Sequence, residues 1–503
     1  RRVVFEKLLK ECSKTELSIL SQLLNPLLTV DFFTDLPVEI VRKILSYLDA
    51  VSLCHCAQVS KRWKELSDDD FVWKDMCERH IGGKCQRCGW GLPLMYNTKR
   101  KATNDMVVYQ NNKRIKKSPT QLATTSTNTN NKNGNNKYSQ NNQNRSSQNT
   151  THYQRRWKEI YAERLLVERN WRNGKYSTKI FEGHTDSVMC LQIDEARSLM
   201  LTGSYDHTIK MWNTDTGKCI RTLEGHSRCV RALQFDENKI ISGSMDKTIR
   251  IWSLKTGHCI RVMESGHFDG IVTLHFDNRI LASGSADHTI KVWNFGSGRG
   301  FTLTGHTDWV NKVQIFNKDH LFSCSDDHTI KYWDLNTRQC IRTFEGHSAP
   351  VQSLQASITY HQPKISKFDG HKSPKQSSDS SNSVSNNNNY NQTINQSLSA
   401  KMKGTKGTLV TCSLDNQIKI WDIFTGECKK TLFGHVEGVW CVSFDNMRIV
   451  SGAHDQTIKV WDMETGKIEQ NFIKHLGPVN CIQLTDTKIV SGGDDGKISI
   501  LDF

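Results

Sequence analysis

The chain has 503 residues, enough for several domains, and a net charge of +15. Residues 1–175 hold 31 Lys and Arg against 17 Asp and Glu (+14), whereas residues 176–503 hold 36 against 35 (+1), so the longer C-terminal part lacks the basic surface expected of a nucleic-acid-binding domain. Sixteen cysteines, with no signal peptide and no apolar run as long as a membrane helix, indicate a reducing, soluble compartment and argue against a membrane protein.

The first 31 residues (1–31) form a predicted N-terminal helical segment. Residues 5–30 carry apolar side chains at helical spacing, so a helix here has an apolar face to bury. Packing of that face against the following module is one expectation. Because the chain begins at Arg1 without an initiator methionine, we also expect it to be part of a longer protein.

Residues 32–76 predict a small all-α module. Asp35 is expected to cap the first helix, with Pro37 in its first turn, where the missing N–H is harmless. The apolar face of this helix is assigned to Ile40, Ile44, Leu45 and Leu48. Two further short helices are marked by Leu53, Val59 and Trp63.

This module resembles an F-box, on its Leu-Pro start, the Ile-Leu-x-Tyr-Leu-Asp stretch, Val-Ser-x-x-Trp and Trp73. The resemblance implies docking on a Skp-type adaptor, which joins a cullin and a RING subunit, and it implies that the chain holds a substrate without performing chemistry. The implied adaptor contacts are Leu36, Pro37, Ile40, Ile44, Leu45, Leu48, Leu53, Val59 and Trp63. The alternative is an ordinary three-helix domain whose apolar residues form only its own core.

A Cys/His segment follows at residues 77–96. Cys77, His80, Cys85 and Cys88 form two pairs with two-residue spacers, which suit a tetrahedral zinc site, although the connection between the pairs is short for such sites. Three interpretations stay open: a zinc site, a thiol pair sensitive to soft metals or oxidants, and inert structure. No cofactor is required by any other feature of the sequence.

Residues 97–153 predict a basic and Asn-rich disordered linker, because too few apolar residues are present to bury a core. Two basic runs within it, Lys99–Lys101 and Lys113–Lys117, match a bipartite nuclear import signal, and a merely solvated linker is the alternative. We therefore expect the protein in the nucleus and the cytoplasm. A linking helix is predicted over residues 154–175.

Residues 176–503 contain seven copies of one pattern of about 41 residues. Each copy opens on a histidine, at His184, His226, His267, His306, His347, His435 and His475. Six copies close on a tryptophan, at Trp212, Trp252, Trp293, Trp333, Trp421 and Trp461, and the seventh has Leu501 there. This period is typical of a four-stranded blade, so the sequence predicts an all-β seven-bladed WD-repeat propeller.

Each copy also contains a Ser/Thr-x-x-x-Asp step between its histidine and its tryptophan, as at Thr202 and Asp206. In WD-repeat blades these groups form a buried hydrogen-bonded chain, and seven copies argue against a single hydrolase triad. Residues 177–181 are predicted to supply the missing strand of the last blade, which closes the ring. A disordered insertion is predicted at 358–406, inside the fifth copy.

Residues 77–94 and 156–174 narrow the resemblance to the fungal F-box/WD-repeat receptors that control sulfur-amino-acid metabolism. The resemblance covers the chain except its two predicted disordered segments. It implies a bZIP-type transcription activator as the substrate. It also implies a homodimer through the N-terminal helical segment, beside the alternative in which this segment packs on the F-box.

The repeat alignment places one set of side chains around the central opening of a propeller face. The predicted substrate-binding residues are Met189, Tyr205, Arg228, Arg231, Trp309, Asn311, Asp326, Trp440, His454, Asn480 and Asp494. Phosphate groups are bound best by several arginines, and only two are present among many carboxylates. We therefore expect a substrate segment that is not multiply phosphorylated, anchored by Trp440, Tyr205 and Trp309.

Taken together, the residues and the resemblance predict a multidomain protein with an F-box module, a seven-bladed propeller and disordered linkers. Its predicted role is the non-catalytic substrate-recognition subunit of an SCF-type ubiquitin ligase. The alternative from a different class is a WD-repeat interaction scaffold outside any ligase. Direct binding of nucleic acid or membrane is not expected, because no groove-reading helix or second basic module accompanies the basic linker.

Overall fold

The computed structural model describes residues 13–19, 22, 31, 36–80, 156–360 and 405–503. The predicted basic linker, its import signal and nearly all of the predicted insertion lie outside these residues, as does most of the N-terminal helical segment. The dimerisation and self-packing alternatives for that segment therefore stay predictions.

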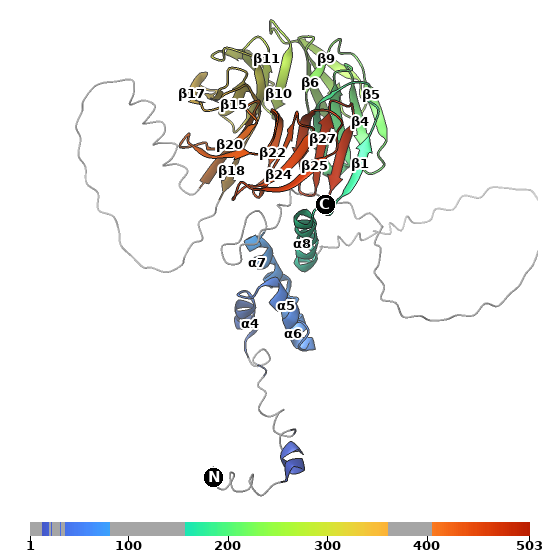
Figure 1. Ribbon diagram of the computed structural model, residues 1–503, viewed down its shortest axis with the longest axis vertical. Helices are drawn as coiled ribbons and strands as arrows, with labels where there is room; N and C mark the ends of the chain where they lie inside the picture. Colours follow the sequence, from blue (N-terminus) through green and yellow to red (C-terminus); the bar gives the residue numbers. More distant parts are fainter. Residues whose placement is uncertain (1–12, 20–21, 23–30, 32–35, 81–155, 361–404) are drawn as a thin grey trace, which may run out of the picture. The chain divides into compact units, whose positions relative to one another are not determined.

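Residues 14–19 are helical, and the other described α-helices lie between residues 38 and 173 (Figure 1). They are α4 (Val38–Leu45), α5 (Ala50–Cys56), α6 (Lys61–Ser67), α7 (Asp70–His80) and α8 (Trp157–Asn173). Side chains cap three of them: Asp49 accepts from the Ser52 N–H before α5 and Ser60 from the Trp63 N–H before α6, both at 3.2 Å, and Asp69 accepts from the Phe71 N–H before α7 at 2.9 Å. None of the described helices has the length and apolar character needed to span a bilayer.

Two details of the helical module differ from the sequence-based expectation. The cap residue of α4 is Pro37, which has no side chain to accept a hydrogen bond, while Asp35 lies outside the described residues. Helix α7 continues to His80, so the boundary expected after Met76 falls inside a helix. The buried indole of Trp73 holds α7 against the end of α6 by donating to the Ser67 carbonyl at 2.8 Å.

The apolar residues of α4 lie on two faces and not on one. Val41 and Leu45 are fully buried in the core of the helical module, with Leu48 packed against it. Ile40 and Ile44 point outward, because neighbouring positions on an α-helix are about 100° apart around its axis. The expectation of one face shared by Ile44 and Leu45 was therefore wrong.

Residues 177–503 form seven four-stranded antiparallel sheets arranged around a common centre, which confirms the predicted propeller (Figure 1). The first three sheets contain β2 (Val188–Asp194), β3 (Leu199–Ser204), β4 (Ile209–Asn213) and β5 (Cys219–Leu223); β6 (Val230–Phe235), β7 (Lys239–Ser244), β8 (Thr248–Ser253) and β9 (Cys259–Glu264); and β10 (Ile271–Phe276), β11 (Ile280–Ser285), β12 (Ile290–Asn294) and β13 (Gly300–Leu303). A short 3-10 turn, Glu195–Arg197, joins β2 to β3.

The remaining sheets repeat this order from the centre outward. They contain β14 (Val310–Ile315), β15 (His320–Ser325), β16 (Ile330–Asp334) and β17 (Gln339–Phe344); β18 (Val351–Tyr360), β19 (Thr405–Ser413), β20 (Gln417–Asp422) and β21 (Cys428–Phe433); β22 (Val439–Phe444), β23 (Arg448–Ala453), β24 (Thr457–Asp462) and β25 (Ile468–Ile473); and β26 (Val479–Leu484), β27 (Lys488–Gly493), β28 (Ile498–Asp502) and β1 (Ser177–Phe181). The predicted insertion leaves the fifth sheet between β18 and β19, which pair from Val351–Ser413 to Tyr360–Thr405.

The ring is closed by the strand that precedes the first repeat. Strand β1 pairs antiparallel with β28, in a register that runs from Ser177 opposite Asp502 to Phe181 opposite Ile498. The last sheet therefore contains strands from both ends of the repeat region, which confirms the predicted closure. Closure also covers the edge that β28 would otherwise expose.

The predicted buried chain of polar groups is present in the sheets. In the first, the Trp212 indole donates to Thr202 Oγ1 at 2.9 Å, Thr202 lies 2.8 Å from His184 Nε2, and His184 Nδ1 lies 2.7 Å from Asp206. Because the carboxylate can only accept, Nδ1 carries the proton and Nε2 accepts from the hydroxyl. The same histidine contacts recur in all seven sheets, at 2.7–3.1 Å to the carboxylate.

Side chains on the innermost strands clamp each sheet to the next. Gln192 donates to the Phe235 carbonyl at 3.2 Å and accepts from the Phe235 N–H at 2.6 Å. The equivalent position in every sheet bonds the backbone of the neighbouring inner strand, through Gln192, Gln234, His275, Gln314, Gln355, Ser443 and Gln483. The ring is thus held by directional bonds as well as by apolar packing.

Helix α8 belongs to two cores. Near its start, Tyr161 is buried with the helical module, and Lys158 pairs with Asp68 at 2.5 Å. Near its end, Trp171 is buried with the propeller and stacks on Phe503, with ring centroids 3.6 Å apart. The helical module and the propeller therefore share one helix and belong to one compact unit.

A buried ion pair fixes the second half of α8. Glu168 and Arg448 of β23 are both almost fully buried, and their charged atoms lie 2.6 Å apart. Arg172 reaches the same carboxylate from the surface at 2.8 Å. Hydrogen bonds at this distance between buried opposite charges compensate part of the large cost of desolvating them.

We expect the propeller to lose stability in acid. Burial lowers the pKa of His267 and His435 below the ordinary 6.5, and burial lowers that of His275 to about 4. Burial alone would raise the pKa of Asp206, but hydrogen bonds from His184 and Thr208 outweigh it and the pKa falls. In each case the native state binds fewer protons than the unfolded chain, so stability is full above about pH 6.5 and decreases as the pH falls.

The measurement is the thermal unfolding midpoint of the chain across this pH range. The midpoint should fall continuously below pH 6.5. A midpoint that stays constant down to about pH 4 would contradict the lowered pKa values of His267, His435 and His275.

A second prediction concerns the buried ion pair. Arg448→Met leaves Glu168 buried without its main partner and should cost about 3–5 kcal/mol of folding free energy. The matched control is Arg172→Met, which removes a half-exposed partner of the same carboxylate and should cost about 0–1 kcal/mol. Denaturant unfolding measures the folding free energy lost in each variant, and amide hydrogen exchange shows whether the loss affects α8. Equal costs for the two variants would contradict the assigned role of Arg448.

Candidate functional site

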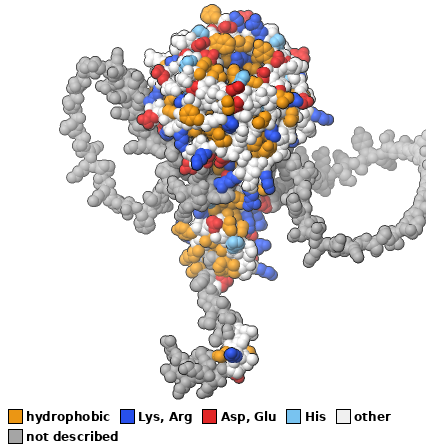
Figure 2. Space-filling model, in the orientation of Figure 1, with side chains coloured by type: hydrophobic (Ala, Val, Ile, Leu, Met, Phe, Trp, Pro, Cys, Tyr) orange, Lys and Arg blue, Asp and Glu red, His pale blue; other side chains and the backbone are white. Residues whose placement is uncertain are grey.

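One surface of the helical module carries an apolar stripe. Ile40 and Ile44 lie on the outer face of α4, and Tyr47 continues their spacing just beyond the end of the helix; the three residues are 47%, 40% and 60% exposed. Val51 of α5 extends the stripe and is 61% exposed. Figure 2 shows hydrophobic side chains on the surface of these helices. Large apolar side chains exposed together are typical of a protein–protein interface.

The structure divides the predicted adaptor contacts into three groups. Pro37, Ile40, Ile44 and Val59 are exposed, and Leu36, Leu48 and Trp63 are partly buried. Leu45 and Leu53 are completely buried in the core of the module, so they offer no surface to a partner and their assignment as contacts is corrected to a core role. Tyr47, Val51 and Phe71 are exposed apolar residues that the sequence analysis missed, although Tyr47 follows Ile40 and Ile44 at positions that continue their helical face.

The predicted Cys/His site is described only in its first half. Cys77 and His80 are buried at the end of α7, while Cys85 and Cys88 lie outside the described residues. The Cys77 thiol points to the Trp157 carbonyl at 3.7 Å, and burial raises its pKa to about 12. His80 Nδ1 donates to the Met76 carbonyl at 2.8 Å. Both side chains are used in the contact between α7 and α8, and the described residues contain no group of three or more metal-ligating side chains.

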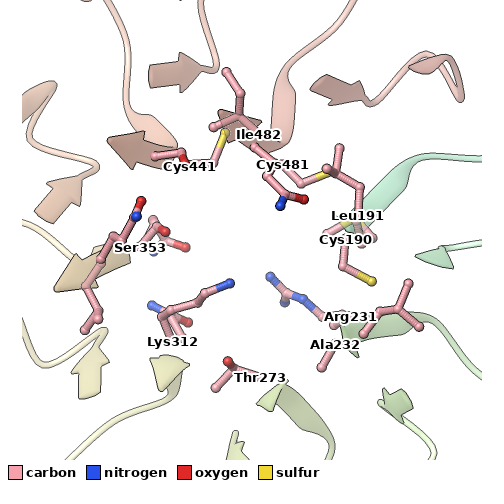
Figure 3. Close-up of a pocket in the computed structure, with 18 of the residues that line it drawn as sticks. Cys190, Leu191, Arg231, Ala232, Thr273, Lys312, Ser353, Cys441, Cys481 and Ile482 are labelled. Carbon is pink, nitrogen blue, oxygen red and sulfur yellow. The ribbon is translucent and has the colours of Figure 1, made fainter. Parts of the chain in front are cut away.

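A channel runs through the centre of the propeller, with a cavity volume of about 400 Å³ (Figure 3). The inner strands of all seven sheets line it. The repeat alignment predicts that the first lining position of each strand faces the central opening, and all seven of these side chains do line it: Met189, Arg231, Val272, Asn311, Gln352, Trp440 and Asn480. Five of them belong to the predicted substrate-binding set.

The other predicted substrate-binding residues lie outside the lining of the channel. Tyr205, Arg228, His454 and Asp494 are exposed, whereas Trp309 and Asp326 are partly buried. Asp326 is tied to its surroundings, since its carboxylate accepts from Asn311 at 2.6 Å and from Gln352 at 3.1 Å. Ser187 donates a hydrogen bond to Asp494, and His454 lies 2.6 Å from the Glu437 carboxylate.

Carboxylates lie in the loops that precede several of the inner strands. Asp186, Asp269 and Asp308 each accept from the N–H of the following residue, at 2.7–2.8 Å, and so shape the loops before β2, β10 and β14. All three remain exposed. Their negative charge disfavours a phosphate dianion nearby, as the sequence analysis expected.

Three exposed apolar residues on these loops were missed. Phe268, Val436 and Leu476 each directly follow the histidine of their repeat and are 87%, 79% and 82% exposed. A signal was available, because the other four repeats have Thr or Ser at this position: Thr185, Ser227, Thr307 and Ser348. They add exposed apolar surface to the loops that precede β10, β22 and β26.

The lining of the channel has only basic charge. Among the residues that the structure describes, Arg231 and Lys312 are its charged members, and no Asp or Glu lines it. His275 is neutral near pH 7, because burial, reinforced by Lys312, lowers its pKa to about 4. Burial raises the pKa of Cys441 to about 12, against the effect of the nearby Lys312 charge, so this thiol is also uncharged. Lys312 was not among the predicted site residues.

Comparisons with protein families match both parts of the chain. The F-box-like family model matches residues 33–79. The model of the WD domain, G-beta repeat, matches residues 175–213, 217–253, 257–294, 299–334, 362–422, 426–462 and 466–502. Among solved structures, the WD40 β-propeller domain of Doa1 aligns with a TM-score of 0.50 at 21% identity, over 65% of this chain and 96% of that one, which supports the fold alone.

Several fungal proteins are similar along most of this chain. It is 41% identical over 470 residues to the probable E3 ubiquitin ligase complex SCF subunit sconB of Talaromyces marneffei, covering 90% of this chain and 70% of the relative. The sconB protein of Aspergillus terreus is 42% identical over 491 residues, with 89% and 72% covered. An F-box protein of Saccharomyces cerevisiae is 39% identical over 461 residues, with 90% and 66% covered.

Proposed function

Because the chain belongs to the sulfur-controller family of F-box/WD-repeat proteins, we propose that it is the substrate-recognition subunit of an SCF-type ubiquitin ligase. The proposal rests on two features that occur in one compact unit. One is the exposed apolar stripe along α4, and the other is the propeller with its central channel. The first surface would bind a Skp-type adaptor and, through it, a cullin and a RING subunit. The second would bind a protein substrate.

The two faces of α4 support separate roles for neighbouring residues. Val41 and Leu45 stabilise the module from inside, while Ile40 and Ile44 keep 47% and 40% of their surface exposed. Burying exposed apolar side chains of this size contributes about 1.5–3 kcal/mol each when they become fully enclosed. A few such residues are enough to anchor a specific interface.

The propeller supports binding of a peptide segment of the substrate. Trp440 lines the channel, and Tyr205, Phe268, Val436 and Leu476 provide exposed apolar surface on loops and turns of the sheets. The carboxylates of the same loops favour a segment with basic or neutral residues around its apolar anchors. This charge distribution supports a segment that is not multiply phosphorylated.

In this role the chain would hold the substrate near the ubiquitin-conjugating enzyme and would not itself form or break covalent bonds. Binding substrate and adaptor to one polypeptide raises the effective concentration of substrate lysines near the ubiquitin-conjugating enzyme. The shared helix α8, packed in both cores, would limit how far the two bound partners move apart. A rigid connection of this kind lowers the entropy lost when the reacting groups meet.

The relatives suggest the biological setting, which we also propose. The substrate would be a transcription regulator of sulfur-amino-acid metabolism, of the bZIP activator type, and the protein would act in the nucleus and cytoplasm. Zinc at Cys77, His80, Cys85 and Cys88 stays a prediction without support from the described pair, because these two side chains are engaged in the core.

The adaptor proposal predicts the effect of an Ile40→Ala, Ile44→Ala double variant. Adaptor affinity should fall at least tenfold, since interface anchors of this kind are worth about 2 kcal/mol or more. The thermal midpoint should fall much less than in Leu45→Ala, because Ile40 and Ile44 are 47% and 40% exposed whereas Leu45 is fully buried. The measurement is a titration of purified Skp-type adaptor against the intact chain and the variant.

Two controls sharpen this experiment. Glu39→Ala changes an exposed residue of the same helix and should leave binding unchanged. Leu45→Ala should cost about 2–5 kcal/mol of stability, because it empties a fully buried site. If the intact chain binds no adaptor or cullin, the ligase proposal is wrong and the scaffold alternative takes its place.

The substrate proposal predicts that Trp440→Ala lowers ubiquitination without affecting adaptor binding. With reconstituted adaptor, cullin, RING subunit and conjugating enzyme, proteins retained by the intact chain should be modified, and the variant should reduce this about tenfold. The control is Ile220→Ala, on the outermost strand β5, which removes an exposed apolar side chain away from the channel. Equal modification by the two variants would exclude the channel from substrate binding.

A further inference from the structure

The second lining position of the inner strands forms a ring of small side chains with one exception. Counting two residues from the Val or Ile that opens each inner strand gives Cys190, Ala232, Thr273, Lys312, Ser353, Cys441 and Cys481. Six are small because neighbouring sheets approach closely there: the Cys190 thiol lies 3.5 Å from the Val230 carbonyl of the next sheet. Lys312 of β14 is the only long side chain at this position, and it is exposed in the channel.

Lys312 faces a second cation inside the channel. Figure 3 shows the Lys312 and Arg231 side chains reaching from β14 and β6 into the open centre, toward one another. No carboxylate lines this channel, and among the described residues neither cation has an ion-pair partner. Like charges that face each other repel, so an anion placed between them would be bound by both.

Trp440 provides an independent sign of a missing acceptor. This residue lines the same channel, and its indole N–H is buried with no hydrogen-bond acceptor among the described residues. A buried donor without an acceptor costs free energy, and such groups are rare in folded proteins. Lys312 and Arg231 thus present donors to the cavity, and Trp440, which lines it from a third sheet, holds a buried N–H without an acceptor among the described residues.

We propose that the channel binds a carboxylate of an acidic side chain, Asp or Glu, carried by the bound substrate segment and held by Lys312 and Arg231. This inference rests on the proposed substrate-receptor function and specifies the chemistry of its ligand. The cavity of about 400 Å³ has room for such a side chain to enter. Flanking residues of the segment would stay outside, where Asp186, Asp269 and Asp308 favour neutral or basic groups.

The charges favour a carboxylate over a phosphate group. A carboxylate carries one negative charge and matches either a guanidinium or an ammonium group, whereas a phosphoserine carries close to two at neutral pH. The exposed carboxylates of the neighbouring loops oppose the dianion more strongly than the monoanion. The expected segment is therefore one acidic residue within an otherwise neutral or basic stretch.

The test uses the full chain bound to its adaptor and a random peptide library displayed on phage. Selected sequences are resynthesised in sets of three, with the acidic residue kept, replaced by its amide, or replaced by phosphoserine. Each set is titrated against the intact chain and against Lys312→Ser, which introduces the small residue found at the matching position of the fifth sheet. Lys467→Ser, at an exposed site outside the channel, is the control for loss of one positive charge.

We expect the acidic peptide to bind at least about tenfold more tightly than its amide, and we expect this difference to vanish in Lys312→Ser but not in Lys467→Ser. Selected peptides that bind equally well as acid and amide would overturn the inference. So would phosphoserine peptides that outbind the acidic ones through Lys312, because the ligand would then be a phosphate.

A second measurement decides the case in which the library yields no binder. Acylation of the Lys312 amine is followed by mass spectrometry in the presence of N-acetylglutamate methylamide or N-acetylglutamine methylamide. The acidic probe should slow acylation of Lys312 relative to Lys467, and the amide probe should not. Equal rates with both probes would contradict a carboxylate site.

Adaptor recovery is scored in the same preparation, which separates the two proposals. Adaptor bound normally, with no preference for the acidic peptide or probe, overturns only the carboxylate site. Loss of adaptor binding with the acidic preference intact counts against the ligase role alone.

Discussion

Closure of the ring is the constraint on which the rest of the propeller depends. Each sheet exposes apolar residues on both faces and can bury them only against two neighbours. The pairing of β1 with β28 supplies the last contact, since it joins both ends of the repeat region in one sheet. Once the ring is closed, the inner strands meet around a narrow channel, and clamps such as that of Gln192 on Phe235 can form between all neighbours.

Repetition explains why the channel is the informative part of the propeller. The buried His–Asp–Ser/Thr chains and the clamps recur from sheet to sheet and serve stability. A side chain that differs from its counterparts in the other repeats does not serve this common stabilising role. Lys312, which stands among small residues at the same position of the other sheets, is the clearest example. Arg231 and Trp440 lie on other inner strands of the same channel, so the three residues line it together only because the sheets close into a ring.

Helix α8 joins the helical module and the propeller through packing on both sides. Tyr161 lies in the helical core, and Trp171 lies in the propeller core. The Glu168–Arg448 pair adds a directional contact inside the second core, where its loss would leave a charge without its main partner. A receptor that must hold a substrate near a transfer site depends on such a connection as much as on either surface.

The sequence by itself determined the repeats, the number of sheets, the closing strand and the F-box resemblance, because these depend on local patterns and spacing that do not require coordinates. It also identified the first lining position of the channel, since that position is fixed relative to each repeat. The tertiary structure decided which apolar residues of α4 are contacts and which are core: Leu45 and Ile44 are equally apolar neighbours, and only packing turns one inward. It alone brought Lys312, Arg231 and Trp440 together, because their proximity depends on closing the ring and not on distance along the chain.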